Sequence, residues 1–89
     1  MSDNIHLLKE KLYQIIVALD DEKTVEDFLK DLCTNKEIEQ MAQRIKAAEL
    51  IKEGKTYTQI QEELDISSAT IARVSQALKY GNGYKKFIK

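Results

Sequence analysis

The chain has 89 residues, room for one small domain, and its 43% hydrophobic and 33% charged residues without proline are typical of an ordered helical protein. A single cysteine excludes an internal disulfide, and with only one histidine the chain gives no basis for a zinc site. No stretch approaches the roughly 18 apolar residues of a membrane span, and no signal peptide opens the chain, so we expect a cytoplasmic protein without membrane contacts.

Charge is unevenly distributed along the chain, although the net charge is only −1. Residues 1–34 carry four lysines against eight acidic residues, hence −4, whereas residues 35–89 carry ten basic against seven acidic residues, hence +3. From Ser67 to the last residue there are five basic residues and no acid. This asymmetry indicates that the C-terminal part faces a polyanion, with a weak and strongly salt-dependent non-specific affinity.

The first third of the chain, residues 1–33, predicts two helices. Apolar side chains recur at steps of three and four in residues 1–20, at Ile5, Leu8, Leu12, Ile15, Ile16 and Leu19. In so short a chain we expect a second subunit to cover this stripe, although a core helix of a monomer has the same pattern. Thr24 and Asp27 predict a capping box for the next helix, which we expect to end near a buried Cys33.

Residues 34–54 predict a central helix, with Thr34 and Glu37 as its capping box and Gly54 just beyond its end. Its expected buried face consists of Ile38, Met41, Ala42, Ile45, Ala48 and Ile51. Arg44 is the basic residue near the middle of this helix. Two interpretations stay open for Arg44, an ion pair with an acidic neighbour on the surface or a functional role.

Residues 58–80 predict a helix-turn-helix. Thr58 and Gln61 are expected to form the capping box of its first helix, and Asp65 lies where the turn requires a positive φ, which aspartate tolerates. Ser67 is a strong N-cap for the second helix. The second helix is expected to bury Ile71, Val74 and Leu78 and to expose Ser68, Ala69, Thr70, Arg73 and Gln76. Small and hydrogen-bonding residues at the start of such a helix are those that a DNA major groove accepts.

The segments on either side of the helix-turn-helix are shorter. Tyr57 is expected to pack under its first helix. Two glycines and an asparagine in residues 81–83 end its second helix. In the remaining tail we expect Phe87 and Ile88 to form a final helical turn that docks on the core or on a partner subunit.

One constellation of residues between Thr34 and Lys79 has a known counterpart. It consists of Thr34-x-x-Glu37, Arg44, Glu49, Gly54, Leu64 and the run Ala69-Thr70-Ile71-x-Arg73-x-Ser75-x-x-Leu78-Lys79. On these residues the chain resembles the tryptophan-repressor family, and as a whole its small Trp-repressor-like YerC/YecD group. The resemblance implies an all-α fold of about five to six helices, an intertwined homodimer, and two helix-turn-helix heads that read successive major grooves of a palindromic operator.

The resemblance also implies which residues act. Ser68, Ala69 and Thr70 match the base-reading positions, and Ser67, directly before them at the start of the helix, is also expected to contact DNA. Gln61, Gln76 and Lys79 match positions that contact mainly the DNA backbone. Arg44 and Arg73 match the two arginines that clamp the corepressor of the tryptophan repressor, and Arg73 is also a candidate for a phosphate contact.

Two departures from the family pattern concern the corepressor. Val74 stands where the family has a glycine that leaves room for an indole ring, and Ala77 stands where the family has a hydroxyl that holds the amino group of the ligand. The lost hydroxyl removes an anchor worth on the order of 1 kcal/mol. We therefore expect no cofactor and no tryptophan binding, while an unknown small-molecule effector at Arg44 and Arg73 stays open.

Two classes of function follow from these observations. The first is a homodimeric regulator of transcription, expected to be a repressor, that binds double-stranded DNA. The second is a protein-interaction module that has kept the helix-turn-helix and lost DNA binding, in keeping with the near-neutral net charge and the acidic first third. An enzyme is not expected, because the chain has no glycine-rich phosphate loop, no catalytic grouping of cysteine, histidine and aspartate, and no base near its serines.

Overall fold

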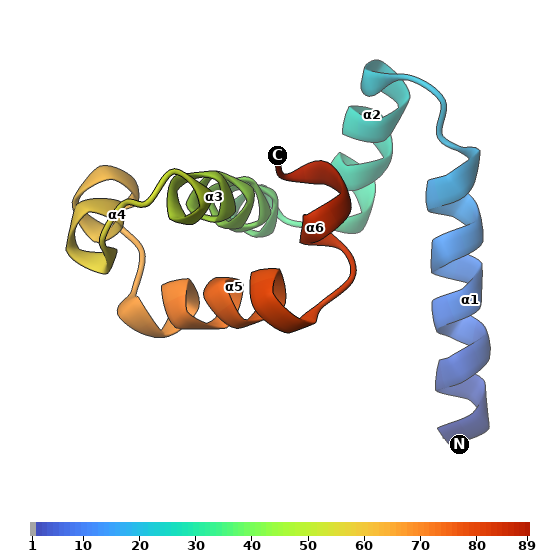
Figure 1. Ribbon diagram of the computed structural model, residues 1–89. Helices are drawn as coiled ribbons and strands as arrows, with labels where there is room; N and C mark the ends of the chain where they lie inside the picture. The colour runs from blue at the N-terminus through green and yellow to red at the C-terminus, as the bar shows by residue number, and fades with distance from the viewer. Residues whose placement is uncertain (1) are drawn as a thin grey trace. The chain divides into compact units, whose positions relative to one another are not determined.

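The computed structural model describes residues 2–89 of the protein, and in that range it contains six helices and no strand. The helices are α1 (Ser2–Ala18), α2 (Glu22–Leu32), α3 (Asn35–Lys52), α4 (Tyr57–Leu64), α5 (Ser68–Tyr80) and α6 (Tyr84–Phe87) (Figure 1). The predicted all-α fold is therefore confirmed. The chain divides between Asn35 and Lys36 into two compact units, the N-terminal unit with α1 and α2 and the C-terminal unit with the remaining helices.

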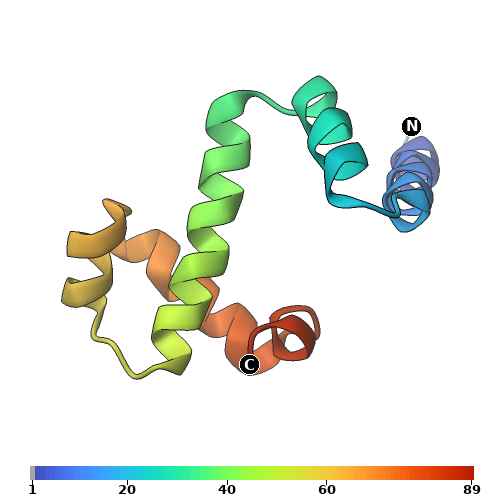
Figure 2. The ribbon, with the colours of Figure 1, turned by 90° about the horizontal axis from the view of Figure 1, so that it is seen from above.

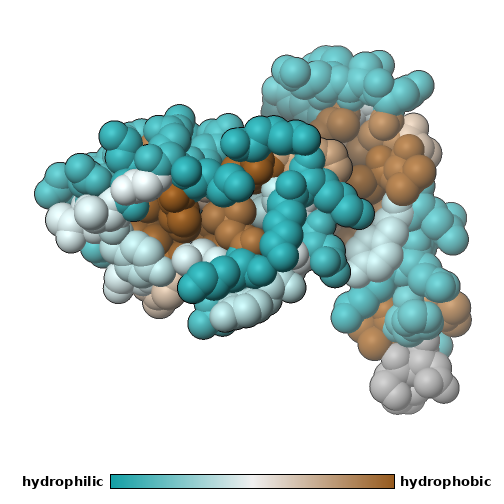
Figure 3. Space-filling model, in the orientation of Figure 1, coloured by the Kyte–Doolittle hydropathy of each residue, from teal (hydrophilic) through white to brown (hydrophobic). Residues whose placement is uncertain are grey.

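The N-terminal unit leaves a hydrophobic surface uncovered on α1. Ile5, Leu8 and Ile16, three members of the predicted stripe, are 52%, 63% and 47% exposed. Hydrophobic side chains are visible at the surface of this helix in Figure 3. The helix was predicted correctly, and within a single chain half of its apolar stripe stays open to solvent, while Leu12, Ile15 and Leu19 are half-buried.

Helix α2 begins two residues before the predicted capping box. Its N-cap is Asp21, whose Oδ1 accepts a hydrogen bond from the backbone N–H of Thr24 over 2.7 Å. The prediction that Thr24 caps this helix was wrong, because aspartate is the stronger N-cap and was available three residues earlier. Beyond the end of the helix, Cys33 is half-buried and not fully buried as predicted.

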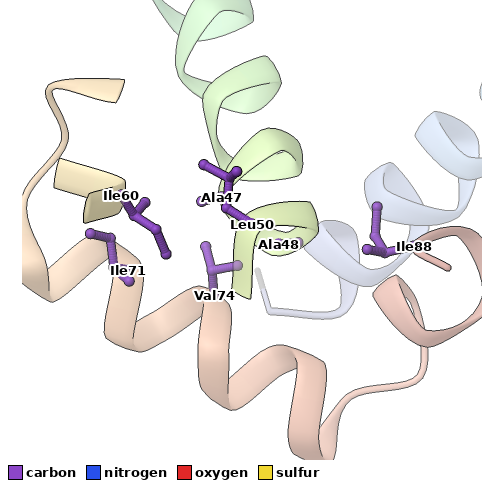
Figure 4. Close-up of a cluster of buried hydrophobic side chains, with 7 residues drawn as sticks. All are labelled: Ala47, Ala48, Leu50, Ile60, Ile71, Val74 and Ile88. Carbon is purple, nitrogen blue, oxygen red and sulfur yellow. The ribbon is translucent and has the colours of Figure 1, made fainter. Parts of the chain in front are cut away.

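The core of the C-terminal unit joins α3, α4 and α5. It consists of Ala47, Ala48, Leu50, Ile60, Ile71, Val74 and Ile88, of which Ile88 is the most exposed at 7% (Figure 4). In Figure 2, α4 and α5 lie beside the C-terminal half of α3, where these side chains meet. Each fully buried isoleucine stabilises such a unit by about 1.5–3 kcal/mol, so this small core holds the two helices of the helix-turn-helix against α3.

The face of α3 that packs inside the chain agrees only in part with the predicted one. Ala48 is buried and Ile51 packs against the core as predicted, and Ile38 and Met41 are half-buried. In contrast, Ala42 is exposed and Ile45 is 50% exposed, whereas Ala47 and Leu50 are buried. Helix α3 is apolar on more than one side, and periodicity cannot tell which side meets α4 and α5. The small side chain of Ala47 lets the helices approach closely there, which a larger residue at that position does not allow.

The start of α4 was predicted two residues too late. Thr56 is the N-cap, and it forms a reciprocal capping box with Gln59, with hydrogen bonds of 3.1 Å and 2.9 Å. Thr56 and Gln59 have the same spacing as the pair that was predicted, Thr58 and Gln61, so the motif alone did not decide between them. Tyr57 thereby becomes the first residue of α4 and is 42% exposed, which corrects its predicted packing role.

The turn between α4 and α5 has the predicted geometry. Asp65 adopts the left-handed conformation, with φ 54° and ψ 47°, and its N–H donates to the carbonyl of Gln61 over 2.9 Å. Ser67 is the N-cap of α5, and Gly54, just beyond α3, has φ 90° as expected of a residue in that position. Leu64 and Ile66, on either side of Asp65, pack against the core.

The C-terminal tail folds back onto the core. Ile88 is only 7% exposed and belongs to the core, and Tyr84 packs against it. Phe87 is 80% exposed and points elsewhere. The predicted docking of a final helical turn is therefore confirmed for Ile88 and does not extend to Phe87 within the chain.

Candidate nucleic-acid interface

Helix α5 presents one buried face and one exposed face. Ile71 and Val74 are buried in the core, and Leu78 packs against it. The exposed face carries most of the predicted DNA-binding residues, namely Ser68, Ala69, Arg73, Gln76 and Lys79, while Thr70 is half-buried at its edge. Gln61 is exposed on α4. We call α5 the recognition helix from here on.

Two hydroxyl groups are already engaged at the start of the recognition helix. The Oγ of Ser67 accepts a hydrogen bond from the backbone N–H of Thr70 over 3.1 Å, and it lies 3.0 Å from the Oγ1 of Thr70. The hydroxyl of Ser68 has no hydrogen-bond partner within residues 2–89. Of the three hydroxyls in this turn, that of Ser68 is therefore the one free to meet a ligand, while Ser67 and Thr70 order the helix start.

The electrostatics of this face favour an anion. Arg73 and Lys79 are exposed, and neither forms an ion pair in the part of the chain that the structure describes. The first N–H groups of a helix have no intrahelical partners and carry partial positive charge; at the start of the recognition helix the N–H of Thr70 is capped by Ser67, and those of Ser68 and Ala69 are left for a ligand. Free N–H groups together with uncompensated positive charge match the phosphate groups of a nucleic acid.

Arg44 lines a polar cleft between α3 and the helix-turn-helix. The cleft has a volume of about 500 Å³ and is lined by Lys36, Glu39, Gln40, Gln43, Arg44, Asp65, Ile66, Ser67 and Thr70. Arg44 is half-buried and forms no ion pair among the described residues, and the carboxylate of Glu49 lies 3.9 Å from the Nζ of Lys46. The interpretation of Arg44 as the ion-pair partner of a neighbouring acid was therefore wrong.

The residues that match the family's corepressor site lie in different surroundings in the single chain. Arg73 is absent from the lining of the cleft that contains Arg44, and Val74 lies in the core with 2% exposure. Ala77 lines a second, apolar cleft of about 620 Å³ near α6, together with Ile45 and Tyr84 among others. Val74 thus fills space inside the core of the single chain.

The described part of the chain shows no cluster of side chains that could hold a metal ion. Its His, Cys, Asp and Glu side chains form no group of three or more. No helix in this part of the chain is long and apolar enough to cross a lipid bilayer.

One residue of this region escaped the sequence analysis. The Nε2 of Gln43 on α3 donates a hydrogen bond of 3.0 Å to the backbone carbonyl of Leu64 at the end of α4. The two residues are 21 positions apart in the chain, so no local motif signals the contact. Its only trace in the sequence is a glutamine one turn before Ala47, on the face of α3 that turns toward the helix-turn-helix.

Comparison with known proteins agrees with this geometry. Residues 8–89 match the family model described as Trp repressor protein. The uncharacterized protein YerC of Bacillus subtilis (strain 168) is 42% identical over 73 residues, which cover 82% of this chain and 70% of YerC.

Two crystal structures have the same fold. A TrpR-like protein from Eubacterium eligens ATCC 27750 is 42% identical, with a TM-score of 0.80 over 86% of this chain and 80% of that protein. A candidate Trp repressor from Staphylococcus aureus is 37% identical, with a TM-score of 0.82 over 90% of this chain and 81% of that protein. The chain belongs to the Trp repressor family.

Proposed function

We propose that this protein is a homodimeric regulator of transcription, and specifically a repressor, that binds a palindromic operator in the cytoplasm. The Trp repressor family is a family of DNA-binding regulators. The observation that carries the proposal is the exposed face of the recognition helix, which has free cationic side chains and is followed by no acidic residue up to the end of the chain. A double helix of DNA is the polyanion that such a face fits.

Each part of this face has a role in the proposal. Arg73, Lys79, Gln76 and Gln61 contact phosphates and set the register of the protein on the duplex. Ser68, Ala69 and Thr70 approach the base edges in the major groove, where the Ala69 methyl suits a thymine methyl and the Ser68 hydroxyl suits several bases. Ser67 holds the helix start in shape through its hydrogen bond to Thr70.

The homodimer of the proposal is supported by the open surface of α1. A single chain leaves Leu8 63% exposed and Ile5 52% exposed, which is unfavourable unless another surface covers them. A second copy that covers this helix would give the dimer two recognition helices, and dimeric helix-turn-helix proteins read half-sites about one helical turn of DNA apart, about 10 bp from centre to centre.

Tryptophan does not act as the effector in this proposal. The support is the burial of Val74 in the core and the lack of a side-chain hydroxyl at Ala77. A calorimetric titration of the protein with tryptophan is expected to give no heat of binding. Binding at micromolar affinity refutes this part of the proposal.

A second candidate function is a protein-interaction module without DNA binding. It is favoured by the acidic charge of −4, four lysines against eight acids, over residues 1–34 and by the exposed apolar side chains of α1. Such a module is expected to bind a duplex neither at low nor at high salt.

A salt titration with a mixed-sequence duplex separates the two candidates. The proposed function predicts binding that weakens steeply with salt, and the Arg73→Ala variant is expected to reduce the slope of log K against log[salt] by about 0.9 for one lost phosphate contact. Lys30→Ala is the control, because Lys30 is an exposed base on α2 outside the interface, 3.3 Å from the Oε2 of Glu26. Equal slopes for the wild type and both variants, or no binding at all, contradict the proposal.

A further inference from the structure

The hydrogen bond between Gln43 and Leu64 is a second attachment of the helix-turn-helix to α3. The first attachment is the core, where Ala47 and Leu50 of α3 meet Ile60 and Ile71. Positions 43, 47 and 50 lie on one face of α3, at steps of four and three residues, so Gln43 continues the packed face by one turn. The bond is half-buried, and its length is 3.0 Å.

The acceptor of this bond has a defined place in the helix-turn-helix. The last four carbonyl groups of a helix have no partner further along the same helix. In α4 the carbonyl of Gln61 accepts from the N–H of Asp65, and the carbonyl of Leu64 accepts from Gln43. Leu64 directly precedes Asp65, the residue whose left-handed conformation starts the turn into the recognition helix. A constraint on this carbonyl is therefore a constraint on the turn.

The two attachments differ in what they fix. Apolar packing is non-directional, and it holds α4 and α5 close to α3 while permitting small rotations. A hydrogen bond requires a short distance and a narrow range of angles. The hydrogen bond from Gln43 joins α3 to the end of α4 across 21 positions of the chain. Gln43 is thus a directional link that sets how the recognition helix is tilted on α3.

We propose that Gln43 is a positioning residue, which holds the recognition helix in the orientation that binds DNA without help from a small molecule. The part of this inference that concerns DNA rests on the proposed function, whereas the part that concerns the turn does not. The link is made by atoms of the chain alone, so the orientation is present before any ligand arrives. A helix-turn-helix that changes its tilt on α3 spends only part of the time in the orientation that binds DNA. Its affinity for DNA is reduced by that fraction.

The test uses matched substitutions on α3 in the full-length protein. Gln43→Met keeps the length of the side chain and removes the donor, and Gln43→Glu places a carboxylate against the carbonyl of Leu64. Gln40→Met is the control, since Gln40 is exposed one turn earlier on the same helix and lines the same cleft, and its side chain forms no hydrogen bond in the described chain.

The first readout is the free protein. Amide hydrogen exchange is measured for residues 64–70 and for the core amides of Ile60 and Ile71. The proposal predicts that Gln43→Met speeds exchange in the turn by about five-fold, the effect of one hydrogen bond, and leaves the core amides nearly unchanged. Turn exchange that equals the wild type, or a uniform acceleration in turn and core, overturns the proposal, because the latter is what a loss of general stability produces.

The second readout is affinity for DNA. Gln43→Met is expected to bind a specific duplex about five-fold more weakly than the wild type, Gln43→Glu more weakly still, and Gln40→Met equally well. Affinity for a mixed-sequence duplex stays unchanged, because it depends on charge and not on the tilt of the helix. Equal specific affinity for Gln43→Met and the wild type overturns the proposal. If the wild type binds no duplex, the proposed function has failed, and the exchange experiment alone decides the role of Gln43 in the turn.

Discussion

Substitutions at and beside Ser67 distinguish residues that stabilise the recognition helix from residues that contact DNA. Its Oγ accepts the N–H of Thr70 over 3.1 Å and lies 3.0 Å from the Oγ1 of Thr70. In Ser67→Ala the backbone N–H and the hydroxyl of Thr70 both lose the oxygen that they contact. Loss of an N-cap destabilises a helical protein by about 0.5–2 kcal/mol, and about 1 kcal/mol lowers the melting temperature of a domain of this size by about 4–8 °C.

Two further substitutions make the experiment decisive. Ser68→Ala removes a neighbouring hydroxyl that has no hydrogen-bond partner within the described residues, so it is expected to leave the melting temperature unchanged and to weaken binding of a specific duplex. Ser67→Asp keeps an N-cap oxygen and favours the helix dipole, but it introduces a negative charge beside the DNA. It is expected to melt near the wild type and to bind DNA more weakly than the wild type.

The assay is thermal unfolding followed by circular dichroism, together with fluorescence anisotropy on one labelled duplex. All variants are compared at the same protein concentration, because association of subunits would make the melting temperature depend on it. The reasoning is refuted if Ser67→Ala melts with the wild type, or if Ser67→Asp melts as low as Ser67→Ala.

The remaining predictions concern stability. Asp65 has φ 54°, a conformation that glycine adopts freely and alanine does not. Asp65→Gly is therefore expected to leave the stability unchanged or to raise it by up to about 1 kcal/mol, and Asp65→Ala to lower it by about 1 kcal/mol. Chemical denaturation measures both changes. Ile60→Ala, fully buried, is expected to cost about 2–5 kcal/mol in the same assay. The hydrogen bond from the backbone N–H of Thr24 holds the pKa of Asp21 below its ordinary value of 3.8. The ionised cap therefore stabilises α2 fully above pH 3.8, and this stabilisation is lost as the pH falls through the lowered pKa. Helicity measured from pH 7 to pH 2 should therefore decline more in the wild type than in Asp21→Asn, which keeps a cap without the titration.

A second acidic group titrates in the same pH range, and the Asp21→Asn comparison removes its influence. Lys30, through a hydrogen bond and its charge, lowers the pKa of Glu26 from its ordinary value of 4.5, and Lys23 adds to this effect. Glu26 therefore also contributes stability that is lost as the pH falls. Because Glu26 is present in both proteins, the difference between their titration curves isolates Asp21. Identical curves contradict the assignment of Asp21 as the cap.

The parts of this fold that could be predicted from the sequence are those decided by neighbouring residues. Asp65 and Ser67 were predicted correctly, because the need for a left-handed residue and for an N-cap oxygen arises within one turn of the chain. The apolar face of the recognition helix followed from periodicity, and Ile71 and Val74 are buried as expected. The N-cap and the buried face together determine which residues of the recognition helix are exposed at the candidate interface.

The errors have physical reasons of two kinds. The first is local degeneracy: Thr56 and Thr58 each precede a glutamine by three residues, so the motif does not decide which threonine caps α4. The second is the long-range choice of a packed face. Helix α3 can turn Ile45 or Ala47 inward, and only α4 and α5, which follow later in the chain, select Ala47.

The contact between Gln43 and Leu64 belongs to the same long-range class. A glutamine on a helix is usually a solvated residue, and nothing in its neighbourhood marks it as a link to a carbonyl 21 residues away. The candidate interface is therefore visible in the sequence, whereas the contact that orients it becomes visible only in the fold.

The measurement that tests the central claim most directly is selection from a random duplex library at physiological salt, with Arg73→Ala selected in parallel. DNA recognition by two paired recognition helices predicts that the wild type enriches a palindrome with half-sites about 10 bp apart from centre to centre, and that Arg73→Ala enriches it less. If the wild type enriches no sequence over the starting library, the face of the recognition helix does not read DNA and the account is contradicted.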